Sequence, residues 1–142
     1  NKIEMINKLG QDKVNEFRRS WDVKPEPLSK KSPYHPLNIE TYKKVPEKII
    51  PDTESLKDTY ERVVKYFEEE LKSSLKDKNI LISAHGNSIR ALCKYLFKLD
   101  NNQISNLEIP TGNPLLIELG KNHKIKNCEY LDKERAKNLL IF

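Results

Sequence analysis

The sequence predicts an α/β protein. Two short apolar runs, Asn79–Ala84 (NILISA) and Leu115–Leu119 (LLIEL), have the length and composition of strands, and the first fits a strand that is covered on both faces. A helical pattern separates them, and two such strands separated by a helix imply a right-handed βαβ crossover. Two or three strands make a small sheet, because ~5–6 are usual. We therefore expect the chain to be part of a larger domain.

The first part of the chain is expected to form helices followed by a long loop. Asn1–Arg19 has helical periodicity, and Gly10 ends its first piece. Val23–Pro51 contains six of the eight prolines of the chain. Proline fixes φ and removes an amide donor, so this stretch is predicted to be a surface loop. Loops of this length are often functional, although a disordered linker is the alternative.

The clearest helix is predicted over Asp52–Leu75. Asp52 and Thr53 are candidates for its N-terminal cap, and Glu54 suits the positive end of the helix dipole. The apolar side chains recur with a period near 3.6 residues and form one stripe. The residues of this stripe are Leu56, Tyr60, Val63, Val64, Phe67 and Leu71.

The second half continues as strand, tight turn and helix. His85–Ser88 interrupts the first apolar run, and helical spacing then resumes at Ile89, Leu92, Cys93 and Leu96. The remaining expected elements are a short helix at Asn102–Asn106, a turn at Pro110–Gly112, the strand at Leu115–Leu119, a polar strand near Lys124–Tyr130 and a tail that ends in Leu139–Phe142.

Charge and composition limit the possible partners. The 142 residues include 26 basic and 21 acidic ones, a net charge of +5. The basic residues are scattered, whereas nucleic-acid binders show a clustered stripe, so no nucleic-acid partner is expected. Cys93 and Cys128 belong to no zinc-ligand pattern, and no metal site is expected. No apolar stretch approaches the ~20 residues of a membrane span.

His85 is the strongest candidate for a catalytic or ligand-binding residue. It follows an apolar strand, and ligands of open α/β sheets bind beyond the carboxyl ends of strands. Gly86 lets the backbone turn, and Asn87 and Ser88 open the next helix, whose free N–H groups attract anions. This arrangement favours a phosphate site. A histidine that only forms a hydrogen bond in a turn is the alternative.

Arg18 and Arg19 are the second candidate, because arginine forks bind phosphate or carboxylate oxygens in a bidentate manner. The alternative is a cationic helix end that only suits the helix dipole. His35 and His123 are expected to be exposed to solvent, and Trp21 is expected to anchor the loop.

Four motifs resemble cofactor-dependent phosphoglycerate mutases, which belong to the histidine phosphatase superfamily. They occur in the family's order and cover nearly the whole chain up to about Leu131. The four are Arg18–Val23 (RRSWDV), Glu54–Thr59 (ESLKDT), Leu81–Leu92 (LISAHGNSIRAL) and Ile109–Leu119 (IPTGNPLLIEL). Trp21 stands where tyrosine is usual in this family.

The resemblance implies a three-layer α/β/α fold and an enzyme that interconverts 2- and 3-phosphoglycerate. It implies a phosphohistidine intermediate, with 2,3-bisphosphoglycerate as the phosphoryl primer and no metal. His85 corresponds to the histidine that stabilises the transferring phosphoryl group. The residues that correspond to ligand-binding positions are Lys2, Arg18, Arg19, Gly86 and Asn87. A small phosphorylated substrate, a homodimer or homotetramer and a cytoplasmic location are implied as well.

The motif that carries the nucleophilic histidine in this family, Arg-His-Gly, does not occur in the sequence. We therefore expect residues 1–142 to be the C-terminal portion of a single domain, without its N-terminal strands and helices and inactive by itself. Two alternatives stay open. One is a bisphosphoglycerate mutase or phosphatase of the same fold, and the other is a truncated non-catalytic relative that binds phosphorylated ligands.

Overall fold

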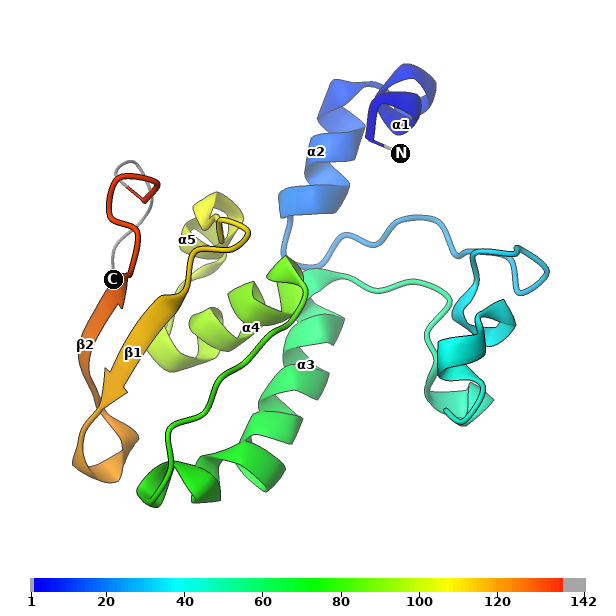
Figure 1. The fold of residues 1–142 in the computed structure, drawn as a ribbon. Helices are drawn as coiled ribbons and strands as arrows, with labels where there is room; N and C mark the ends of the chain where they lie inside the picture. The colour runs from blue at the N-terminus through cyan, green and yellow to red at the C-terminus, as the bar shows by residue number, and fades with distance from the viewer. Residues whose placement is uncertain (1, 137–142) are drawn as a thin grey trace. The chain divides into compact units, whose positions relative to one another are not determined.

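The computed structural model describes residues 2–136 (Figure 1). The chain forms two compact units, Asn1–Asp58 and Thr59–Phe142. The first unit begins with the packed helices α1 (Lys2–Leu9) and α2 (Gln11–Arg19). Gly10 joins them at φ +83°, a left-handed conformation that glycine adopts without steric cost. Both helices and the break between them agree with the periodicity of the sequence.

The proline-rich segment is a loop with short 3₁₀ turns, as its composition predicts. The turns are Pro36–Asn38, Glu40–Tyr42 and Glu47–Ile49. The two ends of the loop are tied together, because the Leu28 amide donates to the Asp52 carbonyl over 2.9 Å. The segment is therefore an ordered closed loop, which argues against the alternative of a disordered linker.

His35 lies at the centre of this loop. The prediction that this histidine is exposed to solvent is wrong. Its side chain has no exposed surface. Its Nδ1 accepts a hydrogen bond from the Leu37 amide over 3.2 Å, and its Nε2 lies 3.1 Å from Asp52 Oδ1. A buried polar side chain must have partners, and both ring nitrogens have one. Lys30 and Glu47 add an exposed ion pair of 3.0 Å across the loop.

Helix α3 (Leu56–Tyr66) begins later than predicted, and its cap is made by different residues. The Ser55 hydroxyl accepts from the Asp58 amide over 3.2 Å, while the Asp58 carboxylate accepts from the Ser55 amide over 2.8 Å. This reciprocal arrangement is a capping box. Asp52 and Thr53 serve the loop instead, where Thr53 donates to the Pro25 carbonyl over 2.7 Å.

The helical path continues past α3 as a π-helical turn, Phe67–Leu71, and a 3₁₀ turn, Lys72–Lys76. The predicted stripe faces the interior at Leu56 and Phe67, which are buried. Tyr95 contacts the edge of the Phe67 ring with centroids 6.0 Å apart, and its hydroxyl donates to Glu68. These contacts accompany the departure from a regular α-helix, which sequence periodicity does not reveal.

The run Asn79–Ala84 forms no strand, contrary to the prediction. Within residues 2–136 the sheet has two strands, β1 (Leu115–Leu119) and β2 (Ile125–Tyr130), which pair antiparallel as a hairpin. A strand needs neighbours for its backbone groups, and no other strand pairs with 79–84 in this sheet. Leu81 is 91% exposed as a result. The predicted βαβ crossover is therefore not formed among these residues.

The remaining helices of the second unit are α4 (Gly86–Phe97) and α5 (Asn101–Asn106), both close to the predicted ranges. Their interior is apolar except for Arg90, and Asp100 caps α5 through a capping box. The most buried apolar residues here are Ala91, Cys93, Ile104 and Leu107. The predicted tail Leu139–Phe142 lies outside the described residues.

Candidate functional site

The N-terminus of α4 carries the histidine that the sequence singles out. His85 is the N-cap residue, with extended backbone angles (φ −62°, ψ 144°). Its carbonyl accepts from the Ser88 amide over 2.9 Å, which begins the helix. Its side chain also caps the helix, because Nδ1 accepts from the Asn87 amide over 3.3 Å. The motif thus folds into the helix start that the sequence predicts, although the strand before it is absent.

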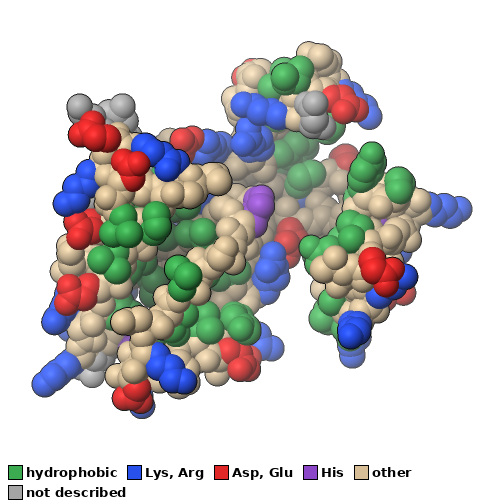
Figure 2. All heavy atoms as spheres, viewed as in Figure 1, with side chains coloured by type: hydrophobic (Ala, Val, Ile, Leu, Met, Phe, Trp, Pro, Cys, Tyr) green, Lys and Arg blue, Asp and Glu red, His purple; other side chains and the backbone are tan. Residues whose placement is uncertain are grey.

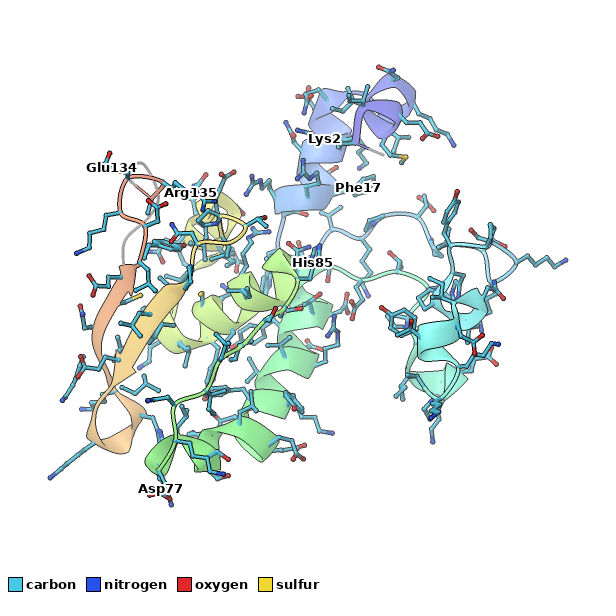
Figure 3. All side chains as sticks on the ribbon, in the orientation of Figure 1. Lys2, Phe17, Asp77, His85, Glu134 and Arg135 are labelled. Atoms are coloured by element: carbon cyan, nitrogen blue, oxygen red, sulfur yellow. The ribbon has the colours of Figure 1, made fainter. Side chains whose placement is uncertain are left out.

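This cap fixes which ring nitrogen of His85 can donate. Nδ1 accepts a hydrogen bond and so carries no proton, which places the proton of the neutral ring on Nε2. His85 is exposed, and within the described part of the chain its Nε2 has no hydrogen-bond partner. Figure 3 shows the side chain at the start of α4. The ring therefore presents an N–H donor to solvent.

His35 shows the same capping geometry, and its outer ring nitrogen Nε2 already has an acceptor. It caps the 3₁₀ turn at Pro36 through Nδ1, and its Nε2 meets a carboxylate oxygen of Asp52. The chain therefore contains one capping histidine whose outer nitrogen holds an oxyanion. His85 repeats this arrangement at an exposed helix start, where an oxyanion from solution can take the place of the carboxylate.

Gly86 and Asn87 lie beside His85 in the first turn of α4. The helix dipole adds a positive potential at this helix start, where the amides of Asn87 and Ser88 already donate to Nδ1 and to the carbonyl of His85. Gly86 leaves open space, since nothing lies within 4 Å of the position of a Cβ. The exposed Asn87 side chain contacts Arg90, whose Nη1 lies 3.2 Å from Asn87 Oδ1. The groups at this helix start that can face a ligand are therefore the His85 Nε2–H and the exposed Asn87 carboxamide.

Arg18, Arg19 and Lys2 lie in the first unit. The two arginines are the last residues of α2, and the Ser20 amide closes this helix end by donating to the Glu16 carbonyl over 2.9 Å. Lys2 is exposed on α1, which packs against α2. The three cations therefore lie on one packed helix pair of the first unit. Because they and His85 belong to different units, their joint contact with one ligand stays a prediction.

Surface charge, metal-binding groups and membrane-spanning helices are features of other kinds of site. Figure 2 shows Lys and Arg side chains interspersed with Asp and Glu over the visible face. Among residues 2–136, no three His, Cys, Asp or Glu side chains form a group that could hold a metal ion. In the same residues no helix is long and apolar enough to cross a membrane.

Sequence reasoning missed one residue of this site, Arg90. It lies within the motif Leu81–Leu92 but is not among the predicted site residues. Its spacing of three residues from Asn87 places both on one face of α4, and this spacing is the signal that identifies it.

Comparisons with known proteins bear on the family of the chain. A family model described as "Histidine phosphatase superfamily (branch 1)" matches residues 20–128. A 2,3-bisphosphoglycerate-dependent phosphoglycerate mutase of Pelagibacter ubique (strain HTCC1062) is 67% identical over 100% of this chain and 60% of its own length. Proteins of the same name from Hyphomonas neptunium and Xylella fastidiosa (strain M12) are 45% and 44% identical over 98% and 92% of this chain. The chain spans 53–60% of the length of these three curated relatives.

Proposed function

The chain belongs to the histidine phosphatase superfamily, and on this basis we propose that the whole protein interconverts 2- and 3-phosphoglycerate by phosphoryl transfer. The membership confirms the α/β fold class and the family resemblance of the motifs. The curated relatives that are named phosphoglycerate mutases support the choice of reaction within the superfamily. The same names favour a mutase over the alternative of a phosphatase.

The observation that carries the proposal is the orientation of His85. Its Nδ1 is engaged by the Asn87 amide, so the ring presents Nε2–H at the start of α4. Preorganised donors that face developing negative charge provide the main stabilisation in phosphoryl transfer. A ring that is held by its own helix cap needs little rearrangement when a phosphoryl group arrives.

The residues of this chain have distinct roles in the proposed reaction. His85 donates from Nε2 to an oxygen of the transferring phosphoryl group. Gly86 and Asn87 bind the same group at the helix start, and Arg18, Arg19 and Lys2 bind the anionic groups of the substrate. The nucleophilic histidine is proposed to lie outside these 142 residues, so this chain supplies charge stabilisation and positioning.

We propose that the helix start binds 2,3-bisphosphoglycerate, the compound in the names of the relatives. An exposed imidazole donor and a helix N-terminus are the groups that bind phosphate esters. This compound would supply the phosphoryl group that primes the enzyme. His85, Gly86 and Asn87 would hold one of its phosphates, and the cations of the first unit would bind the other charges.

The reaction assigns the protein to glycolysis and, in the reverse direction, to gluconeogenesis. A small phosphorylated acid is the substrate, which agrees with the net charge of +5. We place the enzyme in the cytoplasm, where such substrates occur, and we propose a homodimer or homotetramer from the family resemblance.

The test of the proposal uses the full-length protein. Incubation with 2,3-bisphosphoglycerate that carries radioactive phosphorus should yield an acid-labile phosphohistidine, and 3-phosphoglycerate should be converted to 2-phosphoglycerate. A protein that takes up no label and converts no substrate would refute the mutase assignment. Release of inorganic phosphate without isomerisation would favour the phosphatase alternative.

A further inference from the structure

Arg90 is a buried cation at the base of the candidate site. Only 5% of its surface is exposed, and burial of a charged group requires hydrogen-bond partners. Its Nη2 donates to the Ile104 carbonyl over 2.6 Å. Ile104 is fully buried in the last turn of α5, where backbone carbonyls favour a cation. One arm of the guanidinium is thus held by the buried end of α5.

The other arm of Arg90 contacts the side chain of Asn87. A guanidinium carries only donors, so Nη1 can hold the oxygen of the Asn87 carboxamide but not its amino group. The two atoms lie 3.2 Å apart. The amino group of Asn87 therefore lies on the opposite side of the carboxamide from the oxygen that Arg90 holds. Asn87 is exposed, as is His85 with its Nε2–H.

We propose that Arg90 is a positioning residue that sets the orientation of the Asn87 carboxamide, so that its amino group and not its oxygen meets a bound phosphate. The inference rests on the proposed function, in which Asn87 binds the phosphorylated ligand. In the flipped orientation an acceptor oxygen would face an anion and repel it. Arg90 thus acts on the ligand through Asn87 without contacting it.

Arginine suits this role better than lysine. The planar fork reaches the Ile104 carbonyl with one nitrogen and Asn87 with another, whereas a lysine has one nitrogen on a flexible stem. Arg90→Lys should keep the charge near the Ile104 carbonyl but lose control of the carboxamide. This variant therefore separates positioning from a general need for a cation.

The experiment is a double-mutant cycle in the full-length protein with Asn87→Ala, Arg90→Lys and the pair. The measured quantities are the Kd for 2,3-bisphosphoglycerate and the KM for 3-phosphoglycerate. We expect Arg90→Lys to raise both by about tenfold, since hydrogen bonds to charged groups have this effect. In the Asn87→Ala background the same change should have little effect. An equal effect in both backgrounds, or an Asn87→Ala variant with unchanged ligand affinity, would overturn the inference.

A matched control is Lys94 on the same helix. Its Nζ donates to the Leu99 carbonyl over 2.6 Å and to Asn101 Oδ1 over 3.1 Å, so it also joins a carbonyl to an asparagine. Lys94→Met should lower the melting temperature without changing KM. A KM that rises as much in Lys94→Met as in Arg90→Lys would show that the effect is structural and would overturn the inference.

A second measurement separates this inference from the proposed function. In ¹⁵N NMR spectra of the full-length protein, Arg90→Lys should shift the side-chain amide signal of Asn87 and weaken its response to added inorganic phosphate. If these changes occur in a protein without mutase turnover, the proposed function fails and the positioning role stands. If Arg90→Lys does not fold, Arg90→Gln takes its place, and an unmoved Asn87 signal in a folded variant overturns the inference.

Discussion

Replacement of His35 by alanine should open the proline-rich loop while leaving the helices of the first unit intact. The substitution removes the contacts with Asp52 at 3.1 Å and with the Leu37 amide at 3.2 Å. Each hydrogen bond contributes about 1 kcal/mol. The emptied space of a fully buried ring adds to this, for a total of about 3 kcal/mol in the local opening free energy.

The assay is amide hydrogen exchange measured by NMR in the full-length protein. The Leu28 amide reports on closure of the loop, because it donates to the Asp52 carbonyl. A loss of about 3 kcal/mol should speed its exchange roughly a hundredfold, since each 1.4 kcal/mol is about tenfold. The Ser20 amide, which donates to Glu16 in α2, is the internal control and should keep its rate.

Two further variants divide the effect between the two ring nitrogens. His35→Asn places an acceptor near the position of Nδ1 and should keep the cap on the Leu37 amide. His35→Gln places a donor near the position of Nε2 and should keep the contact with Asp52. Exchange at Leu28 should be intermediate for both variants. An alanine variant that exchanges at the wild-type rate at Leu28 would refute the reasoning.

Three other predictions concern the capping box of α3 and the cysteines. Ser55→Ala should lower the free energy of unfolding by about 1 kcal/mol, measured by denaturant titration. The hydrogen bond from the Ser55 side chain lowers the pKa of Asp58 to about 2 from an ordinary 3.8. The stability that Asp58 contributes is therefore fully present above its unfolded pKa and is lost as the pH falls toward 2. The melting temperature of Asp58→Asn should accordingly fall less than that of the wild type between pH ~5 and pH ~2, and equal falls would contradict the assignment. Burial raises the pKa of the Cys93 thiol to about 12, so at pH ~8 a thiol reagent should modify the partly exposed Cys128 first. Modification of Cys93 in the folded Cys128→Ser variant would contradict this prediction.

Local patterns in the sequence predicted most of the elements. Three features occur where the sequence places them. They are the break between helices at Gly10, the strand β1 (Leu115–Leu119) and the helix start after His85. Each depends on neighbours within a few residues: a glycine with positive φ, a β-type apolar run beside a turn, and a cap followed by helical spacing. Such signals are contained in the segment itself and so can be read from it.

The elements that the sequence did not predict depend on distant partners. Asn79–Ala84 has the composition of a buried strand, but a strand also requires neighbours, and the described residues pair only β1 with β2. His35 is buried because Asp52, far along the chain, returns to meet it. The predicted capping residues Asp52 and Thr53 do not cap α3 for the same reason, because both form hydrogen bonds within the loop.

The candidate site was predicted in part. The sequence placed His85, Gly86 and Asn87 at a helix N-terminus, and the structure confirms that position. It did not indicate that the His85 side chain itself caps the helix, because the orientation of a ring cannot be read from spacing. The contact of Arg90 with Asn87 depends on the position of α5, which supplies the carbonyl of Ile104.

Turnover of the His85→Asn variant of the full-length protein tests the central claim most directly. Asparagine keeps an acceptor for the Asn87 amide, so the cap of α4 and the melting temperature should be preserved. It lacks the outer ring nitrogen, so kcat for conversion of 3-phosphoglycerate to 2-phosphoglycerate should fall roughly a thousandfold. A folded His85→Asn protein with the turnover of the wild type would contradict the assignment of Nε2–H as the donor to the phosphoryl group.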